Sequence, residues 1–147
     1  MRGHLEESTA TYWLATVRPS GTPHVMPVLA VWVDGCVYFC AGETTRKAKN
    51  LVLNPYCVVT VEVEALDLVM EGKAVKVRDG AMLRRVADAY ASTYGWRVVV
   101  TEGAFHGTEG APTAGPPPYD VYELTPTVAF GLGLDERFIS TKWRFDE

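Results

Sequence analysis

Apolar and polar residues alternate in short runs over the first eighty positions, a pattern typical of β-strands. Turn residues separate these runs, which cover residues 11–18, 23–33, 36–41, 56–64 and 66–78. In the run 56–64, every second side chain is apolar, so we expect Cys57, Val59, Val61 and Val63 to face a core. Asp34-Gly35 is a strong hairpin signal between two of the runs.

The run 23–33 differs because nearly all of its positions are apolar. Successive side chains of a strand point to opposite faces, so both faces of this strand must be covered. One face can fill a core, and the other must meet a helix, a cofactor or another subunit. Pro27 cannot donate a ladder hydrogen bond, so we expect a sheet edge or a bulge at this position.

Two segments, residues 45–53 and 79–94, show the helical period instead. The first stops at Asn54-Pro55, and the second begins at Asp79 and ends before Gly95. The rest of the chain is predicted to hold short strands at 96–101, 119–125 and 128–132, a long Gly/Pro-rich loop at 102–118, and a tail at 138–145. This element order predicts a mainly β fold, an antiparallel barrel with a few helices, in a single domain spanning residues 1–147.

Composition narrows the functional classes. The 147 residues are 48% hydrophobic and 22% charged, which is ordinary for a globular domain. A net charge of -4 argues against a nucleic-acid partner. No apolar run reaches the length of a membrane span, and the first residues lack the apolar stretch of a signal peptide, so we expect a cytoplasmic protein with no membrane partner.

Cysteine and histidine spacing gives no support to a disulfide framework or a metal site. The three cysteines are an odd number, and Cys36 and Cys40 would lie about 13 Å apart on one strand, too far to bridge. His4, His24 and His106 are widely separated, so we expect no metal.

The most informative segment is 42–50, Gly-Glu-Thr-Thr-Arg-Lys-Ala-Lys-Asn. It joins an apolar strand to a short helix, and the first helical N–H groups attract anions. Thr44 or Thr45 can cap the helix and donate to a phosphate oxygen. Arg46, Lys47 and Lys49 would add positive charge. The alternative is a solvated basic helix face.

The order of these segments resembles the pyridoxamine 5'-phosphate oxidase-like split β-barrel proteins, which bind FMN or the deazaflavin coenzyme F-420. The resemblance rests on the strand 23–28, the hairpin at Asp34-Gly35, and above all Thr-Arg-Lys-Ala followed by Asn50-Leu51 and Asn54-Pro55. Segments 110–119 and 141–145 are similar to the actinobacterial branch, where deazaflavin-dependent reductases are frequent. The resemblance implies a six-stranded split barrel that forms a homodimer with cofactor sites at the subunit interface.

It also implies roles for individual residues. Thr45, Arg46 and Lys47 would hold the cofactor phosphate, with Thr44 and Lys49 beside them. The cofactor ring and its polyol chain would lie along two strands, at His24, Val25, Met26, Pro27, Val28, Cys40 and Ala41. Trp143 and Arg144 would reach the flavin from the C-terminal end.

Several positions keep two interpretations. His24 is either a polar group near the ring or a satisfied strand-edge histidine, and Met26 and Trp32 either cover the ring or form dimer core. The loop 102–118, with His106 and Tyr119, is either a lid over the substrate or a structural wall.

The function expected is therefore hydride transfer between a bound FMN or deazaflavin and a small molecule, with the chemistry carried by the cofactor and no separate catalytic side chain assigned. The alternatives are a protein that binds or sequesters such a cofactor, or haem, without turnover, and a sensor of a phosphate ligand.

Overall fold

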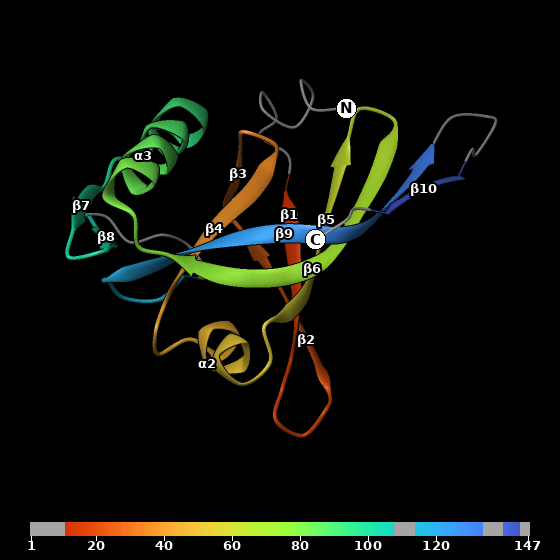
Figure 1. The fold of residues 1–147 in the computed structure, drawn as a ribbon, viewed down its shortest axis with the longest axis horizontal. Helices are drawn as coiled ribbons and strands as arrows, with labels where there is room; N and C mark the ends of the chain where they lie inside the picture. The colour runs from red at the N-terminus through yellow and green to blue at the C-terminus, as the bar shows by residue number, and fades with distance from the viewer. Residues whose placement is uncertain (1–10, 108–113, 134–139, 145–147) are drawn as a thin grey trace.

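A computed structural model describes residues 11–107, 114–133 and 140–144, and strands make up most of them (Figure 1). Within these ranges there are two helices, α2 (Arg46–Leu53) and α3 (Gly80–Tyr94). The strands are β1 (Tyr12–Val17), β2 (Pro23–Val28), β3 (Ala30–Val33), β4 (Cys36–Gly42), β5 (Tyr56–Val63), β6 (Leu66–Val77), β7 (Val99–Thr101), β8 (Ala104–His106), β9 (Tyr119–Gly133) and β10 (Ser140–Arg144). The prediction of a mainly β fold is confirmed. Neither described helix is long and apolar enough to cross a membrane.

The strands form one curved antiparallel sheet in the order β2-β1-β5-β6-β9-β4-β3, with β10 and the β7–β8 hairpin attached to β9. The two end strands, β2 and β3, follow each other in the chain but pair with different neighbours, so the sheet is not closed by hydrogen bonds. The six-stranded barrel remains a prediction. The Asp34-Gly35 hairpin is confirmed, with both residues at positive φ as a two-residue turn requires.

The single strand predicted at 23–33 is wrong, because the chain breaks at Leu29. Up to Val28 it pairs with β1, and from Ala30 onward it pairs with β4. The carbonyl groups at the break are taken by α3, since Tyr90 Oη donates to Leu29 O at 2.7 Å and Tyr94 Oη donates to Ala30 O at 2.6 Å. Pro27 lies in β2 at the edge of the sheet, as its missing N–H predicted.

Later boundaries also differ from the sequence prediction. The two strands expected at 119–125 and 128–132 are one strand, β9, because a register shift between Glu71 and Gly72 on β6 accommodates one extra residue, Thr127, next to Pro126. A Cβ on Gly72 would stand 2.1 Å from Thr125 O, so only glycine allows this close pairing. The strand expected at 96–101 shortens to β7. The loop expected at 102–118 contains β8, while its residues 108–113 and the tail residues 138, 139 and 145 lie outside the described residues.

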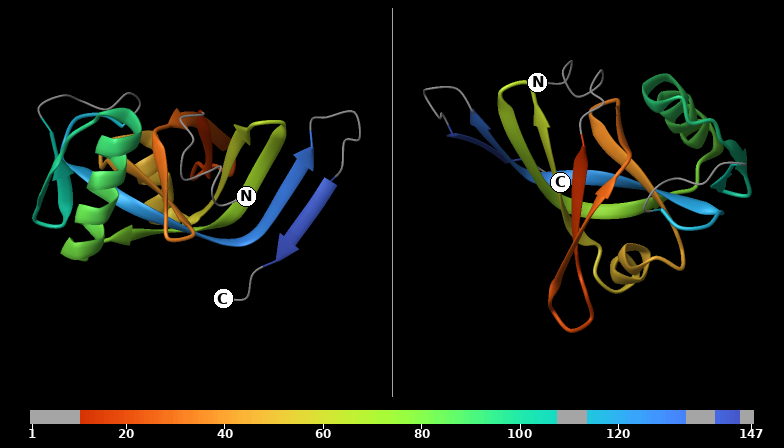
Figure 2. Two further views of the ribbon diagram at one scale, coloured as in Figure 1. Left: turned by 90° about the horizontal axis from the view of Figure 1, so that it is seen from above. Right: turned by 180° about the vertical axis from the view of Figure 1, so that it is seen from behind.

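Two clusters of buried apolar side chains pack against the sheet, one on each face. The inner cluster fills the concave side of the sheet with residues such as Tyr12, Phe39 and Leu124. The outer cluster lies between the other face and α3, which covers one end of the sheet in both views of Figure 2. Trp96 packs edge-on against Tyr90 and Tyr119 there, with ring centroids 5.2 and 5.6 Å apart. The second face of β3 is therefore covered by a helix, one of the coverings expected for it.

Candidate functional site

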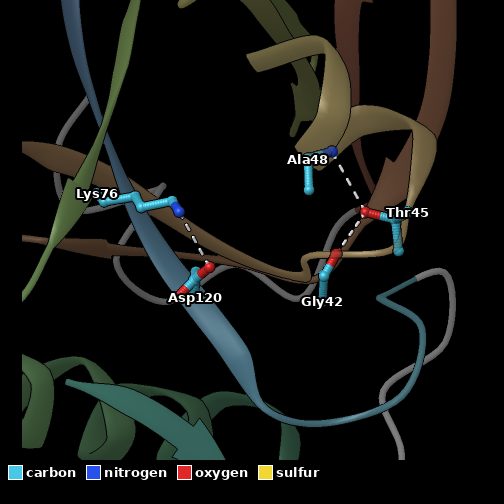
Figure 3. Close-up of polar contacts among 5 residues, drawn as sticks. All are labelled: Gly42, Thr45, Ala48, Lys76 and Asp120. Carbon is cyan, nitrogen blue, oxygen red and sulfur yellow. Dashed lines mark hydrogen bonds and ion pairs between the residues drawn. The ribbon is translucent and has the colours of Figure 1, made fainter. Parts of the chain in front are cut away.

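The strand, turn and helix predicted around residues 42–50 are confirmed. Strand β4 ends at Gly42, and α2 begins at Arg46 with Thr45 as its cap. Thr45 Oγ1 accepts from Ala48 N at 3.3 Å and donates to Gly42 O at 2.8 Å (Figure 3). The Thr45 hydroxyl thus holds the turn together, while the neighbouring Thr44 is exposed. The open N-terminus of α2 has the geometry and dipole that favour an anion.

Three basic residues lie at this N-terminus, two of them exposed and one buried. Arg46 and Lys49 are exposed, so their charges are available to a ligand in solution. Lys47 is only 2% exposed, a degree of burial that is rare for lysine. Burial lowers the pKa of Lys47, and the nearby Cys40 thiol acts weakly in the opposite direction. This positive charge adds to the attraction that the α2 N-terminus exerts on an anion.

The β1–β2 hairpin brings His24 and Arg18 close to the basic residues of α2. His24 pairs with Thr16 across the two strands, and its Nδ1 is sealed from solvent without a hydrogen-bond partner. Burial, followed by the charges of Arg18, Lys47 and Arg46, lowers the pKa of His24. The structure therefore unites His24 with the basic residues of α2, as the candidate site requires.

Sequence reasoning missed Arg18. It lies just beyond β1, and its Nη1 donates to Pro23 O at 2.6 Å, which fixes the guanidinium at the base of the hairpin. A lone arginine before a Pro-Ser-Gly turn carries no local signal of function. Only the antiparallel pairing of β1 and β2 shows that it lies near His24 and α2.

The last part of the long loop packs against the turn before α2. Gly42 N donates to Ala114 O at 2.6 Å, and a Cβ on Gly42 would stand 2.5 Å from Pro116 O. Gly115 has a φ of +80°, and a Cβ there would stand 2.8 Å from Thr45 Cγ2. The Lys76–Asp120 ion pair, with 3.3 Å between Nζ and Oδ2, ties β6 to β9 nearby (Figure 3). Residues 114–116 are thus a wall of the candidate site.

The two residues assigned to a lid lie in different surroundings. Tyr119 is fully buried in the outer cluster, where its ring packs against Trp96. Its backbone pairs with Gly42, so Tyr119 approaches the turn before α2 with its ring turned into the core. His106 is partly exposed at the end of β8, on the hairpin attached to β9. A lid formed by these two side chains stays a prediction.

The strand residues expected along the cofactor divide between two faces. His24, Met26 and Val28 share the inner face of β2, whereas Val25 and Pro27 face outward and Val25 is 53% exposed. Cys40 and Ala41 are both buried, in the outer and inner clusters respectively. Since their side chains point in opposite directions, only backbone groups of both could contact one ligand.

The cysteines have ordinary buried environments. Burial raises the pKa of the Cys40 thiol to about 12, against a smaller opposing effect of its hydrogen bond with Tyr90. Burial also raises the pKa of Cys57 to about 12. All three cysteines are free thiols, and the described residues contain no group of three or more His, Cys, Asp or Glu side chains placed to hold a metal.

Trp143 and Arg144 lie on β10, which Figure 1 places at the other side of the molecule from α2. The Trp143 ring lies over Gly131, where an added Cβ would stand 3.1 Å from it, and it packs against the inner cluster. Arg144 is exposed. Within one chain, the structure does not bring these two residues to the candidate site.

A second hollow lies away from α2. It is a groove of about 840 Å³ across β1, β5, β6 and β9, with Trp13, Val69 and Phe130 among its lining residues. Glu62, Glu64 and Asp67 also line it. Trp13 and Leu132 are 46% and 41% exposed, so this groove carries apolar surface that one chain leaves open.

Comparison with known proteins agrees with this fold. No curated protein matches the sequence. Among solved structures, an F-420 reductase has a TM-score of 0.58 at 24% identity, covering 85% of this chain and 92% of its own. A heme binding protein from Mycobacterium smegmatis has a TM-score of 0.69 at 16% identity, covering 95% of this chain and 55% of its own. A pyridoxamine 5'-phosphate oxidase-related, FMN binding protein from Nostoc punctiforme has a TM-score of 0.57 at 16% identity, covering 93% and 88%.

The family model for pyridoxamine 5'-phosphate oxidase matches residues 4–132, which is most of the chain and includes α2, β2 and the whole candidate site. The resemblance seen in the Thr-Arg-Lys-Ala segment is thereby confirmed. The chain belongs to the pyridoxamine 5'-phosphate oxidase family.

Proposed function

We propose that this protein is an oxidoreductase that binds FMN or the deazaflavin coenzyme F-420 and transfers hydride to or from a small molecule. The observation that carries the proposal is the gathering of Arg46, buried Lys47 and His24 at the N-terminus of α2. A cofactor phosphate is the ligand whose charge and oxygen acceptors suit this set best.

The residues present fit such a cofactor. Lys47 has its charge buried, His24 Nδ1 has no hydrogen-bond partner, and Gly42 and Gly115 let the loop wall approach the turn closely. Exposed Thr44 and Arg46 can complete the phosphate contacts. The site therefore offers charge, donors and a close backbone wall, which are the features of a phosphate cradle.

The chain's residues have distinct roles in this proposal. The bound cofactor supplies hydride chemistry through its ring. Arg46, Lys47 and the α2 N-terminus anchor the phosphate end, and the backbone of β2 orients the ring edge. Burial and the cationic neighbours of His24 lower its pKa, which favours an uncharged hydrogen-bonding ring beside the site. The substrate expected is a small apolar or aromatic molecule.

We further propose that the protein works as a homodimer. The groove over β1, β5, β6 and β9 combines exposed Trp13 with acidic Glu62 and Asp67, and the adjoining β10 carries exposed Lys142 and Arg144. A twofold axis would place the basic strand of one copy against the acidic groove of the other. Such an arrangement would also carry Trp143 and Arg144 to the partner's side of the interface.

The choice between the two cofactors leans toward the deazaflavin. Support comes from segments 110–119 and 141–145, which resemble the actinobacterial branch, and from the similarity to an F-420 reductase. FMN is the alternative, and the FMN binding protein from Nostoc punctiforme shares the fold.

Titration of the apo-protein with FMN and with coenzyme F-420, followed by quenching of tryptophan fluorescence, tests the proposal. We expect saturable binding of one of them, tighter for the deazaflavin, followed by reduction and reoxidation of the bound cofactor with a substrate panel. Tight binding without turnover would support a cofactor-sequestering protein instead. Haem is a necessary third titrant because a heme binding protein shares the fold. Binding of neither flavin by a folded protein would contradict the proposal.

A further inference from the structure

Helix α2 buries an asparagine that the proposed phosphate contacts do not use. Asn50 is fully buried, and its Nδ2 donates to Thr16 Oγ1 on β1 at 3.0 Å. Asn50 Oδ1 is sealed from solvent and has no hydrogen-bond partner. A buried acceptor in this state costs about 1–3 kcal/mol, and native proteins satisfy nearly all such atoms with protein or water.

A second unsatisfied atom belongs to the residue paired with Thr16 across the two strands. His24 is the cross-strand partner of Thr16, and such pairs have Cβ atoms about 5 Å apart. His24 Nδ1 is also sealed without a partner. Thr16, itself only 1% exposed, therefore has Asn50 hydrogen-bonded to its hydroxyl and His24 beside it. Two orphaned polar atoms around one buried hydroxyl form the setting in which proteins hold an ordered water.

We propose that one bound water joins Asn50 Oδ1 to His24 Nδ1, and that Asn50 is thereby a positioning residue for His24. The water satisfies both atoms, and Thr16 is next to both side chains, as the hydrogen-bond partner of Asn50 and the cross-strand neighbour of His24. The link ties the first turns of α2, which carry Arg46 and Lys47, to the inner face of β2. The inference rests on the proposed function only where His24 is said to lie beside the cofactor. The water and its two partners belong to the apo-protein.

The charges that face His24 make the link measurable. They are Arg18 at the end of β1 and Arg46 and Lys47 on α2, all positive. Asn50→Asp would place a carboxylate at the other end of the water and favour the imidazolium form. Arg84→Gln changes the net charge by the same amount on an exposed position of α3, outside the groups that act on His24.

The experiment is an NMR titration of the His24 imidazole in the apo-protein, with the His24→Gln spectrum used for assignment. We expect Asn50→Asp to raise the titration midpoint of His24 by about one pH unit or more, because the carboxylate lies within one water of the ring. Arg84→Gln should leave the midpoint nearly unchanged because exposed, distant charges are screened. Equal shifts in the two variants would overturn the proposal.

A second pair of variants decides the matter if the buried carboxylate of Asn50→Asp prevents folding. Thr16→Val removes the hydroxyl at constant shape, whereas Thr16→Ser keeps it. We expect the Val variant to move the His24 ring resonances and the Ser variant to restore them. A crystal structure of the apo-protein should show the water within hydrogen-bonding distance of both atoms. Unmoved His24 resonances in the Val variant, or a dry gap between the two atoms, would overturn the proposal.

Discussion

The two described helices bury different sets of residues. Helix α3 turns Leu83, Val86 and Tyr90 inward, and it is closed by Asp79 at its start and by Gly95 in the left-handed conformation at its end. Helix α2 buries Lys47 and Asn50 beside two apolar residues, and it leaves Val52 and Leu53 72% and 69% exposed. The first follows the amphipathic rule, and the second departs from it.

This difference indicates that α3 contributes to stability and that α2 contributes to the candidate site. Burying an ammonium group and an amide costs free energy that burying apolar side chains does not. Helix α3 has only to cover the sheet, and apolar residues suffice. Helix α2 has to present charge and hydrogen-bonding groups at the ends of β1, β2 and β4. Departures from local rules of this kind are expected where a site is built.

The largest effect on stability should come from the core of α3. Leu83 is fully buried in the outer cluster, so Leu83→Ala should lower the free energy of unfolding by about 2–5 kcal/mol through lost burial and a residual cavity. Chemical denaturation measures this change. Cofactor affinity of the remaining folded protein should stay unchanged. A selective loss of affinity would show that α3 belongs to the site.

A substitution in α2 should instead lower cofactor affinity and leave stability intact. Lys47→Met keeps the volume and removes a buried charge, so cofactor affinity should fall by about 10- to 100-fold, the value of a hydrogen bond to a charged group. Because burial lowers the pKa of Lys47, the folded protein binds its proton less tightly than the unfolded chain does. The charged form therefore costs stability at neutral pH, and the Met variant should be at least as stable as wild type. A destabilised variant with intact affinity would make Lys47 a structural residue.

The two N-caps offer a matched comparison of smaller size. Thr45 Oγ1 accepts from Ala48 N, and Asp79 Oδ2 accepts from Met82 N at 2.9 Å. Thr45→Val and Asp79→Ala should each cost about 1 kcal/mol in unfolding experiments. Only the Thr45 change should also weaken cofactor binding, as measured by titration. Equal cofactor affinities in the two variants would show that the turn before α2 does not belong to the cofactor site.

The smallest effect is a pH dependence from His24. Its folded pKa lies below the ordinary 6.5, so the unfolded chain takes up this proton first as pH falls. Stability should therefore decline on acidification through and below pH 6.5, and His24→Gln should remove that part of the decline. Thermal unfolding at several pH values measures it. Parallel profiles for the two proteins would show that neither burial nor the neighbouring charges lower the pKa of His24 in the folded protein.

Sequence patterns predicted the local structure well, but they did not predict which residues far apart in the chain come together. The alternation in β5, the Asp34-Gly35 turn and the caps at Thr45 and Asp79 all act within a few residues, so the chain itself carries the signal. The break at Leu29 depends on hydroxyl groups of Tyr90 and Tyr94, some sixty residues away, and no local pattern contains it. The continuous β9 depends likewise on Gly72 opposite Pro126.

The same division holds for the candidate site. Arg46 and Lys47 were found from the segment that carries them, whereas Arg18 joins the site only through strand pairing, and the buried contact between Asn50 and Thr16 arises only from helix packing. Lys47 shows the limit most clearly, because its identity was readable in the sequence but its burial was not.

We propose that α2 anchors an anionic cofactor and that α3 does not. The most direct test is titration of wild type, Arg46→Met and Arg84→Met with FMN and with coenzyme F-420. Both arginines are exposed and each lies on one of the two helices. We expect cofactor affinity to fall about tenfold or more in Arg46→Met alone. Equal affinities in all three proteins, with binding intact, would contradict it.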